Sequence, residues 1–254
     1  MLHYRVIESE KKEWVVFIHP LGGSSATFFN QVREFKKEFN LLLIDLHGHG
    51  KSAKGIEGLS VEDIGRDILN VLDDVGIESA HFVGMCLGNV VLDLVYKLDT
   101  SRFKSIVYGA AVKEINLFNR LLLKVGNVMK NIMPHDVLYS LFALVMMPKR
   151  NHREARLLFI REAKKMKRSD FLDWYNLIMS SQDFYDHWEI ANDHVNKLYL
   201  FGSEDHLFIS KAQEYIDKDN NARLHIIEAV GHMCNVESPR EFNKQAIGFI
   251  KDQN

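Results

Sequence analysis

The sequence predicts an α/β fold, a doubly wound and mainly parallel β-sheet with a helical cap insertion. Short apolar runs that resemble buried strands alternate with stretches of helical apolar spacing over most of the chain, which is typical of βαβ units. Between about residues 112 and 192 this alternation stops and the spacing is helical throughout. A length of 254 residues is sufficient for one large α/β domain.

Six apolar runs are expected to form the strands, because they are compact and several end at glycine-containing loops. They lie at residues 14–18, 40–44, 80–83, 103–108, 197–201 and 222–227. Helices are expected where apolar side chains recur every three or four positions. These stretches lie at residues 26–39, 61–75, 89–96 and 239–251.

The predicted insertion divides the chain into two parts. We expect residues 1–111 and 193–254 to form the core domain and residues 112–192 to form a helical cap (lid). The inserted segment is rich in Leu, Phe and Met, more than a single surface layer needs, which favours a cap over the site. An independent helical subdomain is the alternative.

Composition excludes several classes of function. A formal net charge of -2 gives no support to a nucleic-acid partner. The N-terminal residues lack the apolar core of a signal peptide, and no apolar run approaches the roughly 20 residues that span a bilayer. Two cysteines suit a reducing compartment better than a disulfide scaffold. We therefore expect a cytoplasmic protein without stable membrane insertion.

The most informative feature is Cys86, which lies between Gly84 and Gly88. An apolar run precedes it and a helical pattern follows it. A strand that enters a helix through G-x-nucleophile-x-G forms a nucleophile elbow, a sharp turn that holds the reactive atom clear of the sheet. Here that atom is a sulfur.

A thiol nucleophile needs a base and an orienting acid. Asp205 and His232 are the candidates, since each follows a predicted strand and loops at the carboxyl ends of parallel strands meet in one crevice. Glu204 and Asp193 are neighbouring carboxylates that could replace Asp205.

With five motifs in order, the chain resembles the α/β-hydrolase superfamily in its small, single-domain, capped group. The motifs occupy residues 19–23, 45–52, 84–88, 202–205 and 231–232, the last followed by residues 237–239. The resemblance implies Cys86 as nucleophile, Asp205 as acid and His232 as base, in the family's order. It also implies oxyanion donors at the backbone N–H groups of Leu21 and Leu87. Cysteine in place of serine is the main departure, for which dienelactone hydrolases are a precedent.

The sulfur atom of Cys86 indicates which class of substrate to expect. A helix N-terminus favours negative charge at Cys86 and His232 can hold the proton, so we expect a thiolate–imidazolium pair. Acyl exchange between two sulfurs is nearly balanced in energy. We therefore expect a hydrolase that cleaves a thioester or reactive ester through an acyl-cysteine. An acyltransferase using the same intermediate and a non-catalytic ligand-binding protein are the alternatives.

The expected partner is a small-molecule acyl substrate, with a thiol carrier as one option, and neither a cofactor nor a metal is expected. Substrate contacts are expected from Met85, Leu138, Phe142 and Met146, because methionine adapts to flexible chains. Residues 137–147 could instead form a membrane-seeking face.

Other features have two interpretations each. The basic run at residues 149–168 is either a solvated helix face or a surface that steers an anionic carrier. Cys234 is either a redox partner of Cys86 or a buried bystander. His19, His47 and His49 lack the spacing of metal ligands.

Overall fold

In the computed structural model, which describes residues 1–52, 55–113, 117–180 and 194–253, seven strands form one sheet in the order β1-β3-β2-β4-β5-β6-β7. β1 is antiparallel to β3 and the other pairings are parallel. The strands are β1 (Tyr4–Ile7), β2 (Trp14–Ile18), β3 (Asn40–Ile44), β4 (Ala80–Met85), β5 (Phe103–Gly109), β6 (Asn196–Gly202) and β7 (Ala222–Ile227). The predicted α/β fold with a mostly parallel sheet is confirmed.

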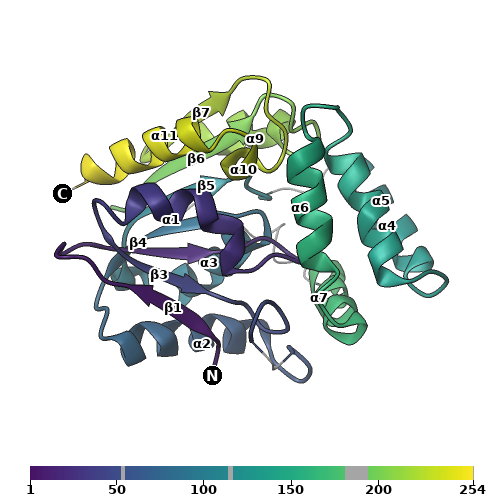
Figure 1. Ribbon diagram of the computed structural model, residues 1–254, viewed down its shortest axis with the longest axis horizontal. Helices are drawn as coiled ribbons and strands as arrows, with labels where there is room; N and C mark the ends of the chain where they lie inside the picture. The colour runs from purple at the N-terminus through teal and green to yellow at the C-terminus, as the bar shows by residue number, and fades with distance from the viewer. Residues whose placement is uncertain (53–54, 114–116, 181–193, 254) are drawn as a thin grey trace.

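Helices cover both faces of the sheet (Figure 1). One face carries η1 (Ser25–Phe28), α1 (Phe29–Phe35), α10 (Cys234–Glu237) and α11 (Pro239–Lys251). The other carries α2 (Val61–Val75), α3 (Leu87–Leu98) and α9 (Ile209–Ile216). A short helix, η2 (Thr100–Arg102), leads into β5.

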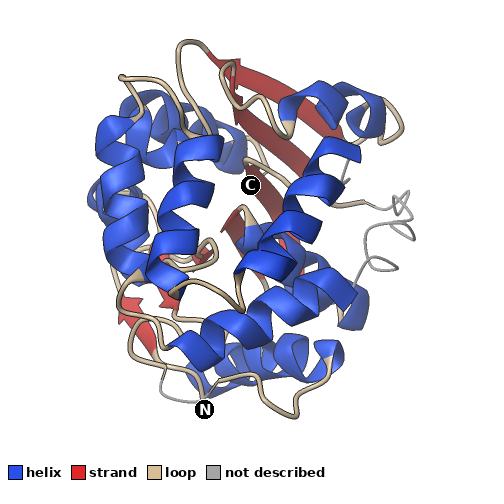
Figure 2. Cartoon of the chain, turned by 90° about the vertical axis from the view of Figure 1, so that its right-hand side faces the viewer, coloured by secondary structure: helices blue, strands red, loops and turns tan. Residues whose placement is uncertain are grey.

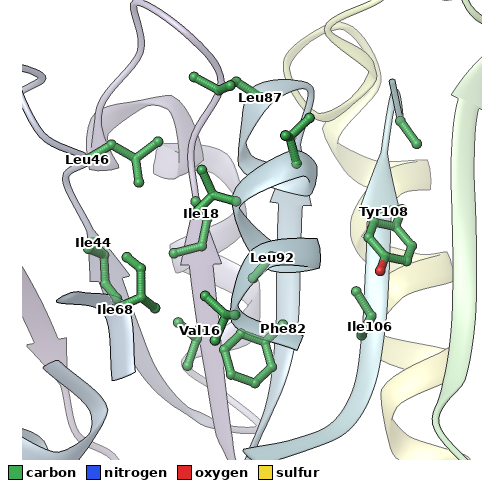
Figure 3. Packing of buried hydrophobic residues seen from close by; sticks show 14 of the residues in the cluster. Val16, Ile18, Ile44, Leu46, Ile68, Phe82, Leu87, Leu92, Ile106 and Tyr108 are labelled. Carbon is green, nitrogen blue, oxygen red and sulfur yellow. The ribbon is translucent and has the colours of Figure 1, made fainter. Parts of the chain in front are cut away.

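The core lies in two layers on either side of the sheet, because successive side chains of a strand point to opposite faces. Figure 3 shows Val16, Ile18 and Phe82 in the layer that also contains Leu92 of α3. Phe17 is among the side chains packed in the opposite layer. Strands buried on both faces need helices on both, as in other parallel sheets. Because β2 to β7 run parallel to one another, the loops that follow these six strands leave from the same edge of the sheet.

In the described residues between β5 and β6, the chain forms four further helices. They are α4 (Leu117–Met129), α5 (His135–Met146), α6 (Arg153–Ala163) and α7 (Arg168–Ser180). Figure 1 shows them grouped at one side of the molecule, and Figure 2 views that side directly. Part of the segment expected as a cap, residues 114–116 and 181–193, falls outside the described residues.

Hydrogen bonds connect the inserted helices to loops at the edge of the sheet. The indole Nε1–H of Trp174 on α7 donates to the carbonyl of His47 at 2.8 Å. Ser24 Oγ donates to the carboxylate of Glu162 on α6 at 3.2 Å. In the described part of the chain, no helix is long and apolar enough to cross a membrane.

Two expectations for local structure need correction. β1 was not predicted, because it has only four residues and Arg5 and Val6 are exposed, so it gives little hydrophobic signal. The helix expected at residues 26–39 is shorter: η1 and α1 end at Phe35, and turns follow.

Candidate active site

Cys86 occupies a strained turn between β4 and α3. Its φ of 49° and ψ of -112° are rare for a side-chain-bearing residue. The backbone N–H of Cys86 and the side-chain amide of Asn89 both donate to the carbonyl of Gly109, at 3.1 and 2.8 Å. A Cβ at Gly88 would come within 2.2 Å of the carbonyl oxygen of Ile18, so only glycine permits this close approach. The turn leaves Cys86 partly accessible at the N-terminus of α3.

His232 and Asp205 meet beside this turn. The Nδ1 of His232 and Oδ2 of Asp205 lie 2.9 Å apart, and both side chains are fully buried. A Cβ at Gly202 would approach the carbonyl oxygen of Val230 to 2.1 Å, so glycine lets the Asp205 loop pack directly against the His232 loop. Two loops separated by 27 positions are thereby held together.

The charge balance at His232 favours the imidazolium. Burial opposes that charge, but the charges of Asp205 and Cys86, together with the hydrogen bond to Asp205, outweigh it and raise the pKa of His232 well above its usual range. The Nε2 atom makes no aligned hydrogen bond within the described residues. Catalytic hydrogen bonds are often loose until substrate binds. The ring is thus oriented by Asp205 on one side and affected by Cys86 on the other.

The loop after β2 is held by a buried histidine. His19 Nε2 accepts from the backbone N–H of Leu46 at 2.9 Å, so Nδ1 carries the proton and donates to the carbonyl of Pro20 at 2.8 Å. The N–H of Gly23 donates to the same carbonyl at 2.9 Å. These bonds fix the Pro20–Leu21 peptide, whose N–H is one of the two expected oxyanion donors.

Both polar groups of the Leu21–Gly22 peptide make hydrogen bonds to side chains. The N–H of Gly22 donates to Nε2 of His49 at 2.9 Å, while Nδ1 of His49 donates to the carbonyl of His47. The hydroxyl of Tyr139 on α5 donates to the carbonyl of Leu21. The role of Tyr139 was not anticipated, and an isolated tyrosine within an apolar run was the only available signal.

Both loop histidines are neutral at physiological pH. Burial lowers the pKa of His19. Burial, together with repulsion from His19 when that ring is protonated, lowers the pKa of His49 to about 3. A neutral ring has one acceptor nitrogen, which the bonds to Leu46 and Gly22 require. Burial and the charge of Cys86 raise the pKa of Tyr139 well above its usual range, so its hydroxyl remains a donor.

An apolar cavity of about 270 Å³ begins at Cys86 and extends between the inserted helices. Leu21 and Leu87, the two residues expected to supply oxyanion donors, line it beside Cys86. The other walls are side chains of α3, α4, α5, α6 and α7 and of the loop after β6. Its lining suits an apolar ligand group beside Cys86.

The four side chains expected to contact substrate do not lie together. Leu138 and Phe142 on α5 line the cavity. Met85 is fully buried in the core layer that contains Phe17, because alternation along β4 turns it to that face of the sheet. Met146 is buried on α5, among the side chains of the other core layer. Neither methionine lines the cavity, so these two expectations are not matched by its geometry.

The neighbouring candidates have other partners. Glu204 bonds to Nε2 of His152 and to Lys149, each at 2.7 Å. Asp193 lies outside the described residues. Cys234 is buried against the carbonyl of Leu200 at 3.7 Å, and burial raises the pKa of its thiol. Within the described ranges, no group of three or more His, Cys, Asp or Glu side chains could hold a metal ion.

The sequence and fold together define the class of protein. Residues 13–239 match the model of the alpha/beta hydrolase fold family. The chain belongs to this family.

The proteins to which the chain is similar include hydrolases. The chain is 22% identical over 237 residues to 3-oxoadipate enol-lactonase 1 of Acinetobacter baylyi, covering 93% of this chain and 88% of the relative. A hydrolase from Pseudomonas aeruginosa has a similar structure, with a TM-score of 0.83, 19% identity, and coverage of 98% and 94%. An esterase from Exiguobacterium antarcticum has a TM-score of 0.82, 15% identity, and coverage of 98% and 95%.

Proposed function

We propose that this protein is a hydrolase that cleaves a thioester or a reactive ester through an acyl group carried on Cys86. One observation carries the proposal: Cys86, on a strained turn at a helix N-terminus, adjoins both the buried His232–Asp205 pair and an apolar cavity. A nucleophile, an oriented base and a binding site for an apolar group are thus adjacent.

The first step forms the acyl-cysteine. The thiolate sulfur of Cys86 attacks the carbonyl carbon, a C–S bond forms, and the carbonyl electrons move to oxygen. The N–H groups of Leu21 and Leu87 stabilise that oxyanion, each by about 3 kcal/mol. As the oxyanion collapses, the bond to the leaving thiolate or alkoxide breaks and His232 Nε2 gives it a proton. Asp205 keeps the ring oriented throughout.

The second step releases the acid. His232, now neutral, takes a proton from water, whose oxygen attacks the acyl carbon. The second oxyanion uses the same two donors. Its collapse breaks the C–S bond and returns the Cys86 thiolate beside the His232 imidazolium, and the raised pKa of His232 favours that imidazolium.

The inserted helices are proposed to act as the cap. Residues 112–192 would cover the core formed by residues 1–111 and 193–254. The bonds from Tyr139 to Leu21 and from Trp174 to His47 support this division, because both connect inserted helices to loops that border the site. The apolar cavity beneath them favours an apolar acyl group.

An acyltransferase that uses the same intermediate is the second candidate. The apolar cavity wall favours it, because such a wall offers little to hold a hydrolytic water. Added alcohols, amines or thiols would then yield acylated acceptor in place of free acid.

The test is hydrolysis of a series of straight-chain acyl thioesters, followed by release of free thiol. We expect wild type to be active, Cys86→Ala to be inactive and Cys86→Ser to be strongly impaired. Cys234→Ala, which removes the other thiol, is the matched control and should remain active. Full activity in both Cys86 variants would overturn the proposal.

A further inference from the structure

Two inserted helices expose apolar side chains on their outer surfaces. On α4 and the turn after it, these recur every three or four residues and are each more than half exposed, up to 74% for Ile132: Phe118, Leu121, Val125, Val128 and Ile132. That spacing aligns them along one side of the helix. On α5, Val137, Leu141 and Leu144 repeat the pattern. We call these eight residues the outer cap face. Their regular spacing distinguishes them from the single apolar residues that are scattered over most protein surfaces.

The outer cap face borders the opening of the cavity. Val125 on α4 and Leu141 on α5 line the cavity, yet 51% and 46% of their surfaces are exposed. Residues that are both lining and exposed mark where a cavity meets the surface. Figure 1 shows α4 and α5 at the outer edge of the molecule, away from the sheet. An apolar chain could therefore pass from this face towards Cys86.

The inserted helices carry an excess of positive charge. Residues 117–180 contain 12 Lys and Arg but 5 Asp and Glu, although the whole chain has a formal net charge of -2. Lys124 is exposed on α4. Arg168 of α7 reaches the turn that carries Ile132, where it donates to the carbonyls of Lys130 at 2.7 Å and Met133 at 2.9 Å.

We propose that the outer cap face docks on an anionic lipid surface. An apolar stripe bordered by Lys and Arg is the pattern of helices that lie in a membrane interface, and basic residues add attraction to anionic headgroups. In a symmetric pair of this chain, the same basic residues would face one another. An acidic carrier protein would match the charge but leave the apolar stripe unexplained.

Docking would present the opening of the cavity to the lipid that supplies its acyl group. That consequence rests on the proposed function, whereas the docking itself does not. Cys86→Ala should therefore bind vesicles as wild type does, so a failure of the chemistry and a failure of the docking are separable.

The test is co-sedimentation with vesicles of phosphatidylcholine alone and of equal parts phosphatidylcholine and phosphatidylglycerol. We expect binding to the anionic vesicles to be stronger by about tenfold or more and to weaken at high salt. Leu121→Ser/Val128→Ser/Ile132→Ser should lose about tenfold or more of that binding, since none of these three lines the cavity and only surface contact is removed. Phe29→Ser, on α1 and 77% exposed, is the matched control and should bind normally.

Charge is tested with Lys124→Glu against Lys218→Glu, which changes an exposed lysine on the core. Only Lys124→Glu should weaken binding, with circular dichroism and cleavage of a soluble short-chain ester showing that each variant is folded. Equal binding to neutral and anionic vesicles, or unchanged binding by the triple variant, would overturn the proposal. So would a dimer in solution that the triple variant dissociates, or capture of an acidic acyl carrier protein without lipid binding.

Discussion

The hydroxyl of Tyr139 donates a hydrogen bond to the backbone carbonyl of Leu21, 118 positions earlier in the chain. This bond joins α5 to the loop whose Leu21 N–H is proposed to stabilise the oxyanion. The N–H of Gly22, which belongs to the same peptide as the Leu21 carbonyl, donates to Nε2 of His49. The position of the donor therefore depends on the inserted helices as well as on the core.

Removing the Tyr139 hydroxyl should slow catalysis without weakening binding. In Tyr139→Phe, we expect kcat to fall about fivefold, which corresponds to a hydrogen bond worth about 1 kcal/mol, with KM little changed. Tyr175→Phe removes a similar bond to the carbonyl of Leu123 within the insertion. It should lower stability but affect kcat far less. Equal losses of kcat in the two variants would show that Tyr139 acts only through stability.

Two adjacent carboxylates should differ sharply in their effect on rate. Asp205→Asn keeps the side-chain shape but removes the charge that stabilises the imidazolium, so kcat should fall by about 10³- to 10⁴-fold. Glu204→Gln is the matched control, because Glu204 bonds to His152 and Lys149. Steady-state kinetics on a thioester measures both, and a larger loss from Glu204→Gln would reverse our assignment of the acid.

Filling the cavity should change the preferred acyl chain. Leu138 lines the cavity, so Leu138→Trp should reduce kcat/KM for long straight-chain thioesters by about tenfold or more. The larger side chain would take up space that several methylene groups of a long acyl chain need. The acetyl thioester should be affected least. Leu144→Trp, on the exposed side of the same helix, should leave the chain-length profile unchanged. A uniform loss across chain lengths would indicate that the acyl group binds elsewhere.

His49 should make the fold sensitive to acid. Burial holds its pKa at about 3, against 6.5 for an ordinary histidine. Between these values the unfolded chain binds a proton that the folded protein does not, so stability is lost as the pH falls from about 6.5 towards 3. Inside that window the free energy of unfolding falls by about 1.4 kcal/mol for each pH unit of acidification. Above about pH 6.5, the stabilisation that depends on a neutral His49 is fully present.

His49→Gln tests this contribution, because its amide oxygen can still accept from the N–H of Gly22 but does not titrate. Urea unfolding at several pH values should give a shallower loss of stability in the variant. Parallel curves for the two proteins would contradict the assignment to His49.

The sequence predicted the parts of the molecule that are locally determined. The six runs beginning at Trp14 and ending at Ile227 form strands, because compact apolar segments between loops have few other stable arrangements. The loops carrying Cys86, Asp205 and His232 converge because parallel strands leave their carboxyl ends at one edge. Topology alone requires this convergence.

Other features depend on contacts that no local pattern encodes. Tyr139 reaches Leu21 only through the packing of α5 against the core, and the orientation of Met85 depends on which face of β4 borders the cavity. Helical spacing in the insertion indicated helices. The sequence left open a membrane-seeking face at residues 137–147, but it did not indicate which apolar side would remain exposed or that α4 would contribute to it.

The central claim is a covalent acyl group on Cys86, and intact-mass measurement tests it most directly. Wild type, Cys86→Ala and His232→Ala would each be mixed briefly with straight-chain acyl thioesters and quenched in acid. We predict that wild type gains the mass of one acyl group, that the adduct maps to Cys86 and decays with time, and that Cys86→Ala gains none. His232→Ala should acylate far more slowly. Turnover by wild type without any adduct under rapid quenching, or an equal adduct on Cys86→Ala, would contradict the account.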